Sequence, residues 1–188
     1  MGIEIRPLKE NDLENVRLFT DKWIGENYFS IEELQQIFMW SQKDGLTASF
    51  LAVEGETIAG ARLTYAPGVW INPQTRGLSS DLWQTNPKNM AYFKSLFVSG
   101  DYQQKGIGKS LSDQSIEVLK KMDAKAILCH SWLESPGNSS QRYLQKMGFD
   151  SVKEHEKFWY PIDYECTRCS PSKCVCTAME MIKYLREE

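Results

Sequence analysis

The stretch "GDYQQKGIGKS", Gly100 to Ser110, is the part of the sequence that indicates the fold most directly. It follows the apolar run Leu96-Phe97-Val98 and precedes residues with helical spacing, so it is a glycine-rich turn from a strand into a helix. Free main-chain N–H groups and the positive end of the helix dipole converge at such a turn. The stretch therefore predicts a binding site for phosphate groups of a ligand.

A nucleotide-binding P-loop is one candidate for this site, but its spacing does not fit. That motif requires Gly, four residues, and then Gly-Lys-Ser/Thr. Gly108-Lys109-Ser110 supplies the second half, whereas Gln103 stands where the first glycine belongs. A side chain at that position would intrude on the β-phosphate. The pyrophosphate of coenzyme A is the competing candidate.

The residues on both sides of the loop predict an alternation of strands and helices. The expected strands cover about 3–6, 50–53, 57–65, 91–98, 126–133, 149–160 and 177–185. The expected helices cover about 13–23, 31–38, 107–122 and 138–147, and Ser30 and Glu33 form a capping box before the second. The segment 66–90 is rich in proline and glycine and long for a plain connection, which indicates function or mobility. This order is of the α/β class (α+β in some schemes), and nothing marks a boundary within 1–188.

Four stretches of the sequence resemble the GNAT superfamily of N-acetyltransferases, which bind acetyl-coenzyme A. Gln103-x-x-Gly106-x-Gly108 resembles the coenzyme loop of that family, although Gly100 stands where many members carry proline. "IEIRPLKENDLENVRLF" resembles the opening strand and helix, "NSSQRYLQKMGF" the second coenzyme motif, and "MEMIKYL" the last strand. The resemblance implies a single GNAT domain with a mixed central sheet flanked by helices, and a cysteine-rich loop at about 163–177 before the last strand.

The resemblance also implies which residues bind acetyl-coenzyme A. Main-chain N–H groups from Gln104 to Lys109 are expected to hold the pyrophosphate, with Gly106 and Gly108 allowing close approach. The strand before the loop is expected to present a main-chain N–H to the thioester carbonyl. The expected coenzyme-binding residues are Leu96, Phe97, Val98, Gln103, Gln104, Lys105, Gly106, Ile107, Gly108, Lys109, Ser110 and Asn138.

The general base and the general acid depart from the family pattern. Many relatives carry a glutamate on the strand before the loop, where this chain has Tyr92-Phe93-Lys94-Ser95. Glu134, ahead of the motif asparagine, is the candidate base, with a solvated strand end as the alternative. Relatives often use a tyrosine where this chain has Leu144, so Tyr143 is the candidate acid, with simple packing as the alternative. We expect Glu134 to contribute more to turnover than Tyr143.

Four of the five cysteines fall within eleven residues, in the pattern Cys166-x2-Cys169-x4-Cys174-x-Cys176. In a reducing compartment such crowding favours a metal over disulfides, and Cys-x2-Cys is good spacing for zinc. Free or oxidised thiols and an iron–sulfur cluster are the alternatives. The expected zinc would be structural, because four thiolates close its coordination shell.

The composition limits the function classes. A net charge of −3 argues against a nucleic-acid partner, and no apolar run is long enough to cross a membrane. We expect a cytoplasmic N-acetyltransferase that acts on a primary amine. Aromatic residues such as Trp23, Trp83 and Trp159 are candidates for lining the acceptor pocket, with simple packing as the alternative. A non-catalytic acyl-coenzyme A sensor and a zinc-dependent interaction protein are the alternatives. No motif specifies the acceptor or the oligomeric state.

Overall fold

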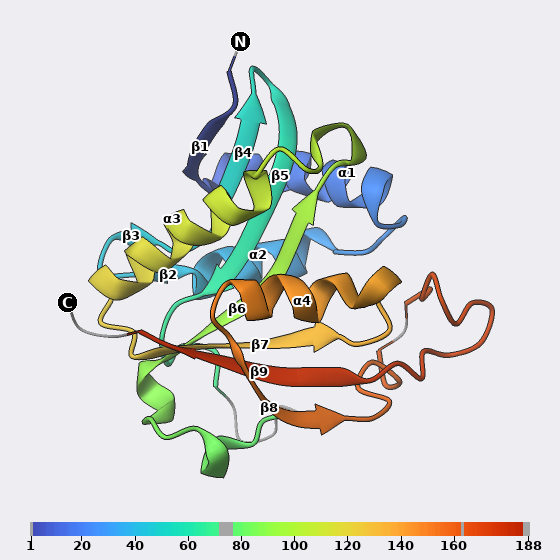
Figure 1. Ribbon diagram of the computed structural model, residues 1–188. Coiled ribbons are helices and arrows are strands. Elements are labelled where there is room, and N and C mark those ends of the chain that lie inside the picture. Colours follow the sequence, from blue (N-terminus) through green and yellow to red (C-terminus); the bar gives the residue numbers. More distant parts are fainter. Residues whose placement is uncertain (1, 72–76, 163, 186–188) are drawn as a thin grey trace.

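The structure is a computed structural model that describes residues 2–71, 77–162 and 164–185 (Figure 1). Residues 72–76 of the long connection and residue 163, at the expected start of the cysteine-rich loop, lie outside this range. The strands are β1 (Glu4–Pro7), β2 (Gln42–Lys43), β3 (Leu46–Thr47), β4 (Phe50–Glu54), β5 (Thr57–Tyr65), β6 (Met90–Val98), β7 (Ala126–Trp132), β8 (Asp150–His155) and β9 (Ala178–Tyr184). The helices are α1 (Leu13–Trp23), α2 (Ile31–Trp40), α3 (Ile107–Lys121) and α4 (Ser139–Lys146).

The described residues form a seven-stranded sheet in the order β1-β4-β5-β6-β7-β9-β8. Its strand pairs are antiparallel except for β6 and β7, which are parallel and joined through α3. Because a parallel pair needs a crossover, α3 lies against the sheet and begins near the end of β6 (Figure 1). The predicted mixed sheet flanked by helices is confirmed.

Two hydrophobic layers cover opposite faces of the sheet. On one face, α1 and α2 pack through residues such as Val16 and Leu34 against Leu63 of β5. On the other face, α3 and α4 pack through residues such as Leu119 and Leu144 against β6, β7 and β9. Apolar side chains at helical spacing thus meet alternating strand residues, as the sequence pattern requires.

Local signals explain where the first helices begin. The predicted capping box is present, since the Ser30 hydroxyl accepts from the Glu33 N–H at 3.1 Å and the Glu33 carboxylate accepts from the Ser30 N–H at 2.8 Å. Asp12, before α1, forms a bidentate pair with Arg6 of β1, with both contacts at 2.7 Å.

No helix among the described residues is long and apolar enough to span a bilayer.

The predicted strand over 149–160 is wrong beyond His155. Lys157 has a left-handed backbone with φ of 51°, and the Phe158 N–H bonds to the carbonyl of Cys176. Phe158 then stacks on His130 at 4.5 Å between ring centroids, which holds the chain in a turn. The small β2–β3 hairpin was not predicted, because strands of two residues carry no periodic signal.

Candidate functional site

β6 and β7 separate part-way along their length. Their pairing runs from Met90 opposite Ala126 to Phe93 opposite Cys129 and ends there, although both strands continue. Toward β5, the register shifts so that Lys94 is an extra, bulged residue. A bulge bends its strand, so the edge of β6 that faces β7 is left open from Lys94 onward. The predicted thioester-binding residues Leu96, Phe97 and Val98 lie on this open stretch.

The coenzyme loop joins the open end of β6 to α3. Gln104 and Gly106 have left-handed backbones, with φ of 61° and 77°, and Ile107 begins the helix. Such turns direct successive N–H groups to one side, and the first N–H groups of a helix have no partner within it. The Gln103 amide closes the loop by donating to the Val98 carbonyl at 3.3 Å. The predicted residues therefore have the backbone geometry of an anion-binding turn, and their binding of the coenzyme stays a prediction.

Close packing explains the glycine at position 108. A β-carbon there would lie 3.3 Å from Leu96 Cδ2 and 3.7 Å from Val98 Cγ2, so α3 rests directly on the open part of β6. The first turn of α3 contains no acidic residue. Lys105 lies over the Tyr102 ring at 4.9 Å, and Lys109 pairs with Asp113 of the next turn at 2.6 Å. Both lysines are exposed beside the loop.

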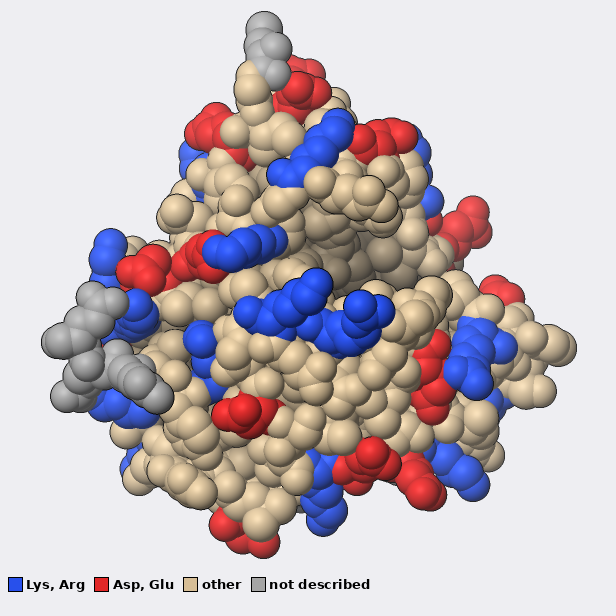
Figure 2. Space-filling model, in the orientation of Figure 1, with Lys and Arg blue, Asp and Glu red and all other residues tan. Residues whose placement is uncertain are grey.

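Figure 2 shows a hollow between the start of α3 and α4, with basic side chains on both sides of it. This hollow lies over the region where β6 and β7 separate (Figures 1 and 2). Its basic rim and the anion-binding turn are complementary to a ligand with several phosphates.

Asn138 stands at the start of α4 with a left-handed backbone. Its side-chain N–H donates to Gln141 at 2.6 Å, while its Oδ1 is buried without a partner among the described residues. A buried carbonyl oxygen without a donor is costly, and the N–H of a bound ligand would satisfy it. The unpaired Oδ1 is consistent with the expected role of Asn138 in coenzyme binding, which stays a prediction.

The two candidate catalytic residues lie on either side of Asn138. Both carboxylate oxygens of Glu134 accept from the Thr177 N–H at 3.0 Å, which ties the end of β7 to the segment before β9. The Tyr143 hydroxyl donates to the Gly108 carbonyl at 2.9 Å and lies 2.8 Å from the Ser112 hydroxyl. Both side chains are thus engaged within the protein, and their catalytic roles stay predictions.

Arg62 of β5 is a buried cation that the sequence analysis missed. It is 3% exposed, donates to the Ser112 hydroxyl at 2.8 and 3.2 Å, and lies 4.0 Å from the centre of the Phe93 ring. Burial lowers its pKa, and Tyr143 and Cys129 act in the opposite direction. A lone arginine inside the apolar strand 57–65 was the available signal.

The α1/α2 face carries a buried polar cluster below the open strands. His130 Nε2 lies 2.6 Å from the Gly77 carbonyl and must donate to it, so Nδ1 accepts from the Tyr92 hydroxyl at 2.9 Å. Burial lowers the pKa of His130 to about 4, so its ring is neutral at pH 7. Glu180, fully buried, accepts from Trp83 Nε1 and from the Ser79 N–H. Trp83 is therefore a core residue at 1% exposure, contrary to its expected place in an acceptor pocket.

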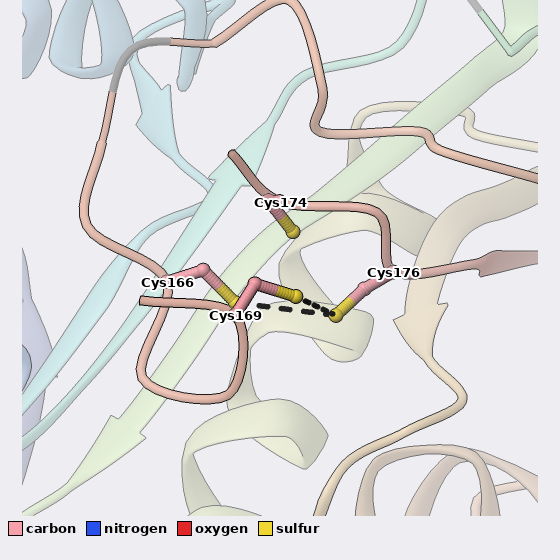
Figure 3. Close-up of side chains that lie close together, drawn as sticks. All are labelled: Cys166, Cys169, Cys174 and Cys176. Atoms are coloured by element: carbon pink, nitrogen blue, oxygen red, sulfur yellow. Dashed lines mark hydrogen bonds between the residues drawn. The ribbon is translucent and has the colours of Figure 1, made fainter. Parts of the chain in front are cut away.

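The four clustered cysteines meet at the end of the sheet beyond β8 and β9. Figure 3 shows Cys166 and Cys169 from one turn facing Cys174 and Cys176 from the returning chain. Their Sγ atoms all lie within 4.8 Å of one another, and none forms a disulfide. Cys176 Sγ lies 3.9 Å from that of Cys166 and 3.6 Å from that of Cys169. Zinc–sulfur bonds of about 2.3 Å give a tetrahedral edge of about 3.8 Å, so the cluster fits a zinc ion.

The surroundings of the cluster suit thiolate ligands. Burial opposes ionisation of Cys166, but the main-chain N–H groups of Arg168 and Cys169 outweigh it and lower the pKa to about 7. The Tyr164 hydroxyl donates to Cys174 Sγ at 3.3 Å. Trp132 Nε1 is buried with no hydrogen-bond partner among the described residues. Burial raises the pKa of Cys176, and the nearby Trp132 N–H acts in the opposite direction and lowers it. A thiolate at Cys176 would supply the missing acceptor.

The comparisons with known proteins agree with this geometry. The model of the acetyltransferase (GNAT) family matches residues 13–149. NAA60 of Arabidopsis thaliana, solved with acetyl-CoA, aligns with a TM-score of 0.71 at 17% identity over 98% of this chain and 100% of that one. The putative acetyltransferase yncA of Salmonella typhimurium, also with acetyl-CoA, aligns with a TM-score of 0.69 at 13% identity over 100% and 96%. Ard1 of Thermoplasma volcanium gives 0.68 at 14% identity over 100% of both chains. No curated protein sequence matches the chain.

Proposed function

The chain belongs to the GNAT family of acetyltransferases, and on that premise we propose that it transfers the acetyl group of acetyl-coenzyme A to a primary amine. The observation that carries the proposal is the direct connection of the open edge of β6 to the anion-binding turn at Gln104–Lys109. A coenzyme held by its pyrophosphate at that turn can extend its thioester along the hollow toward the open strand. The proposed coenzyme-binding residues are those expected from the sequence, which are Leu96, Phe97, Val98, the loop from Gln103 to Ser110, and Asn138.

The proposed reaction is a direct attack on the thioester. The lone pair of the neutral amine forms the new C–N bond, and the carbonyl oxygen gains negative charge that a main-chain N–H of Leu96–Val98 would stabilise. Such a preorganised donor contributes about 3 kcal/mol to lowering a barrier. The C–S bond then breaks, the nitrogen loses a proton to a base, and the coenzyme A thiolate takes a proton from an acid. The products are the acetylated amine and free coenzyme A.

Glu134 and Tyr143 remain the proposed base and acid. An amine with a pKa near 10 arrives protonated at pH 7, so a proton acceptor is needed. The Glu134 carboxylate has lone pairs beyond those that accept from Thr177. Tyr143 is connected to the cation of Arg62 through the Ser112 hydroxyl, and this chain of hydrogen bonds fixes the position of its hydroxyl group at the start of the proposed coenzyme site.

Steady-state release of coenzyme A with a panel of amines tests this function. Release that depends on an amine, together with acetylated product of matching amount, supports the transferase. Tight binding of acetyl-coenzyme A without release for any amine would favour the non-catalytic sensor instead.

We also propose that Cys166, Cys169, Cys174 and Cys176 hold one structural zinc ion. The mutual Sγ distances and the buried Trp132 indole N–H support four thiolate ligands. Four protein ligands leave no open position, so the ion would order the loop and would not activate a substrate. Thiols remain reduced and free to bind zinc in a reducing compartment, which is why we place the protein in the cytoplasm.

A further inference from the structure

We propose that Lys94 binds a carboxylate of the acceptor, so that the acceptor is an amine that also carries a carboxylate group. This inference rests on the proposed acetyl transfer and names its substrate class. It follows from the position of Lys94, from the face on which its charge lies and from the absence of an ion pair to it among the described residues.

Lys94 occupies the point where the sheet opens. It directly follows Phe93, the last residue of β6 that pairs with β7. It is also the residue left over where Ser95 pairs with Leu63 and Phe93 pairs with Thr64 of β5. A bulge at this point displaces the chain from the regular ladder and re-aims its side chain. Lys94 is therefore at the apex of the space between the separating strands, two residues before the proposed thioester-binding stretch.

The charge of Lys94 lies on the face opposite the coenzyme helix. The Lys94 charge helps to lower the pKa of His130. Burial lowers the pKa of Lys94 itself, and the carboxylate of Glu33 in α2 raises it again in part. His130 and α2 both belong to the α1/α2 face, whereas the coenzyme loop leads into α3 on the other face. Since the coenzyme approaches from the α3 side, the α1/α2 side is left for the acceptor.

The Lys94 ammonium forms no ion pair within the described parts of the chain, and Glu33 is the one acidic group that acts on its pKa. The side chain is exposed to solvent and therefore accessible to a ligand, while desolvation by the surrounding protein lowers its pKa. Two aromatic residues of β6 flank Lys94 in the sequence on this face. Phe97 packs against Tyr28, and Tyr92 packs against Tyr65. A carboxylate brought by a ligand could form with Lys94 the ion pair that the described residues do not supply.

The same charge also suits the chemistry of the amine. The Lys94 cation repels the protonated form of the acceptor amine and attracts its carboxylate. An acceptor anchored by its carboxylate at Lys94 Nζ would therefore present its nitrogen as the neutral nucleophile that the transfer requires.

Matched pairs of acids and amides test the proposal. The probes are glycine, β-alanine, 4-aminobutyrate and phenylalanine, each with its own amide, titrated by calorimetry into the protein with coenzyme A bound. We expect at least one acid to bind wild type at least tenfold more tightly than its amide. Lys94→Met should abolish that difference, and Lys94→Arg should keep most of it. Unchanged coenzyme affinity in both variants is the control for folding.

Two results would overturn the inference. One is wild-type binding in which no acid exceeds its amide. The other is an equal loss of binding affinity for acid and amide in Lys94→Met. That result would mean that the lysine contacts the thioester or supports the fold and does not bind the acceptor carboxylate. Coenzyme A release with the same probes separates this question from the proposed function: absence of release with every amine contradicts acetyl transfer, while the binding comparison still decides the role of Lys94.

Discussion

The Tyr143 hydroxyl of α4 donates a hydrogen bond of 2.9 Å to the main-chain carbonyl of Gly108 in the first turn of α3. Gly108 is thereby held between Tyr143 on one side and Leu96 of β6 on the other. The two helices that border the hollow are thus fastened to each other at the start of the proposed coenzyme site. Substitution of Gly108 or Tyr143 should therefore change coenzyme affinity or turnover more than it changes the structure of distant parts of the sheet.

Gly108→Asp should weaken acetyl-coenzyme A binding by more than tenfold. The new side chain would press on Leu96 and Val98 and place a negative charge beside the pyrophosphate. Gly108→Asn is the matched control, because it adds almost the same volume without the charge and should bind more tightly than the aspartate variant. Calorimetry on folded variants provides the measurement, and an affinity equal to that of wild type in Gly108→Asp would contradict the site.

Glu134→Gln should lower kcat/KM more than Tyr143→Phe. The glutamine can still accept from the Thr177 N–H, so the change removes the proposed base while it preserves the local contact. Tyr143→Phe loses two hydrogen bonds and should lower the free energy of unfolding by about 1 kcal/mol. Both variants are compared at saturating coenzyme, with unfolding measured in parallel. A much larger loss of activity in Tyr143→Phe would reverse the ranking and assign the tyrosine to the chemistry.

Sequence patterns predicted the elements whose residues carry a local signal. The turn at Gln103–Gly108 follows from its glycine placement, and the capping box at Ser30 follows from the spacing of Ser30 and Glu33. The packing of Gly108 against Leu96 was not predicted, because this glycine was expected to allow close approach of the coenzyme. The cysteine cluster followed from spacing alone, and the structure brings its sulfur atoms together.

Contacts between distant segments were beyond those patterns. Arg62 meets Ser112 and Phe93 only once three elements have packed, and no local spacing encodes that meeting. The end of β8 depends on Phe158 stacking on His130, which overrides the extended tendency of the chain. The bulge at Lys94 is likewise a property of how two strands align.

His130 should make the protein less stable as the pH falls from 6.5 to 5. Its folded pKa is lowered to about 4, so the unfolded chain binds a proton in this range while the folded chain does not. Stability is therefore complete above the unfolded pKa of about 6.5 and decreases by about 1.4 kcal/mol for each further pH unit, or about 2 kcal/mol at pH 5. The groups that act on the ring are Gly77 and Glu180, which raise the pKa, and His155 and Lys94, which lower it.

Urea unfolding at pH 7 and pH 5 measures this effect, and His130→Gln is the control. Glutamine can donate to the Gly77 carbonyl and accept from Tyr92, but it does not titrate. The difference between the two pH values should shrink by most of the 2 kcal/mol in the variant. An equal difference in both proteins would assign the pH dependence to other groups.

Removal of metal should raise the KM for the acceptor and leave coenzyme affinity nearly unchanged. The described part of the loop around Cys166–Cys176 has few apolar residues, so the ion would supply much of the free energy that orders it. Trp132 contacts the cysteine cluster and lies on β7, which borders the opening between the strands, so disorder in the loop would reach the acceptor side first. The coenzyme turn at Gln104–Lys109 belongs to a separate part of the core and should survive.

Elemental analysis of protein purified without added metal is the direct measurement, and we expect close to one equivalent of zinc. Cys169→Ser should lower that content, whereas Cys129→Ser, which changes a cysteine on β7 outside the cluster, should retain it. Less than about half an equivalent of zinc, with four thiols titrating freely, would show that the cluster consists of reactive cysteines. Iron with visible absorbance would instead indicate an iron–sulfur cluster.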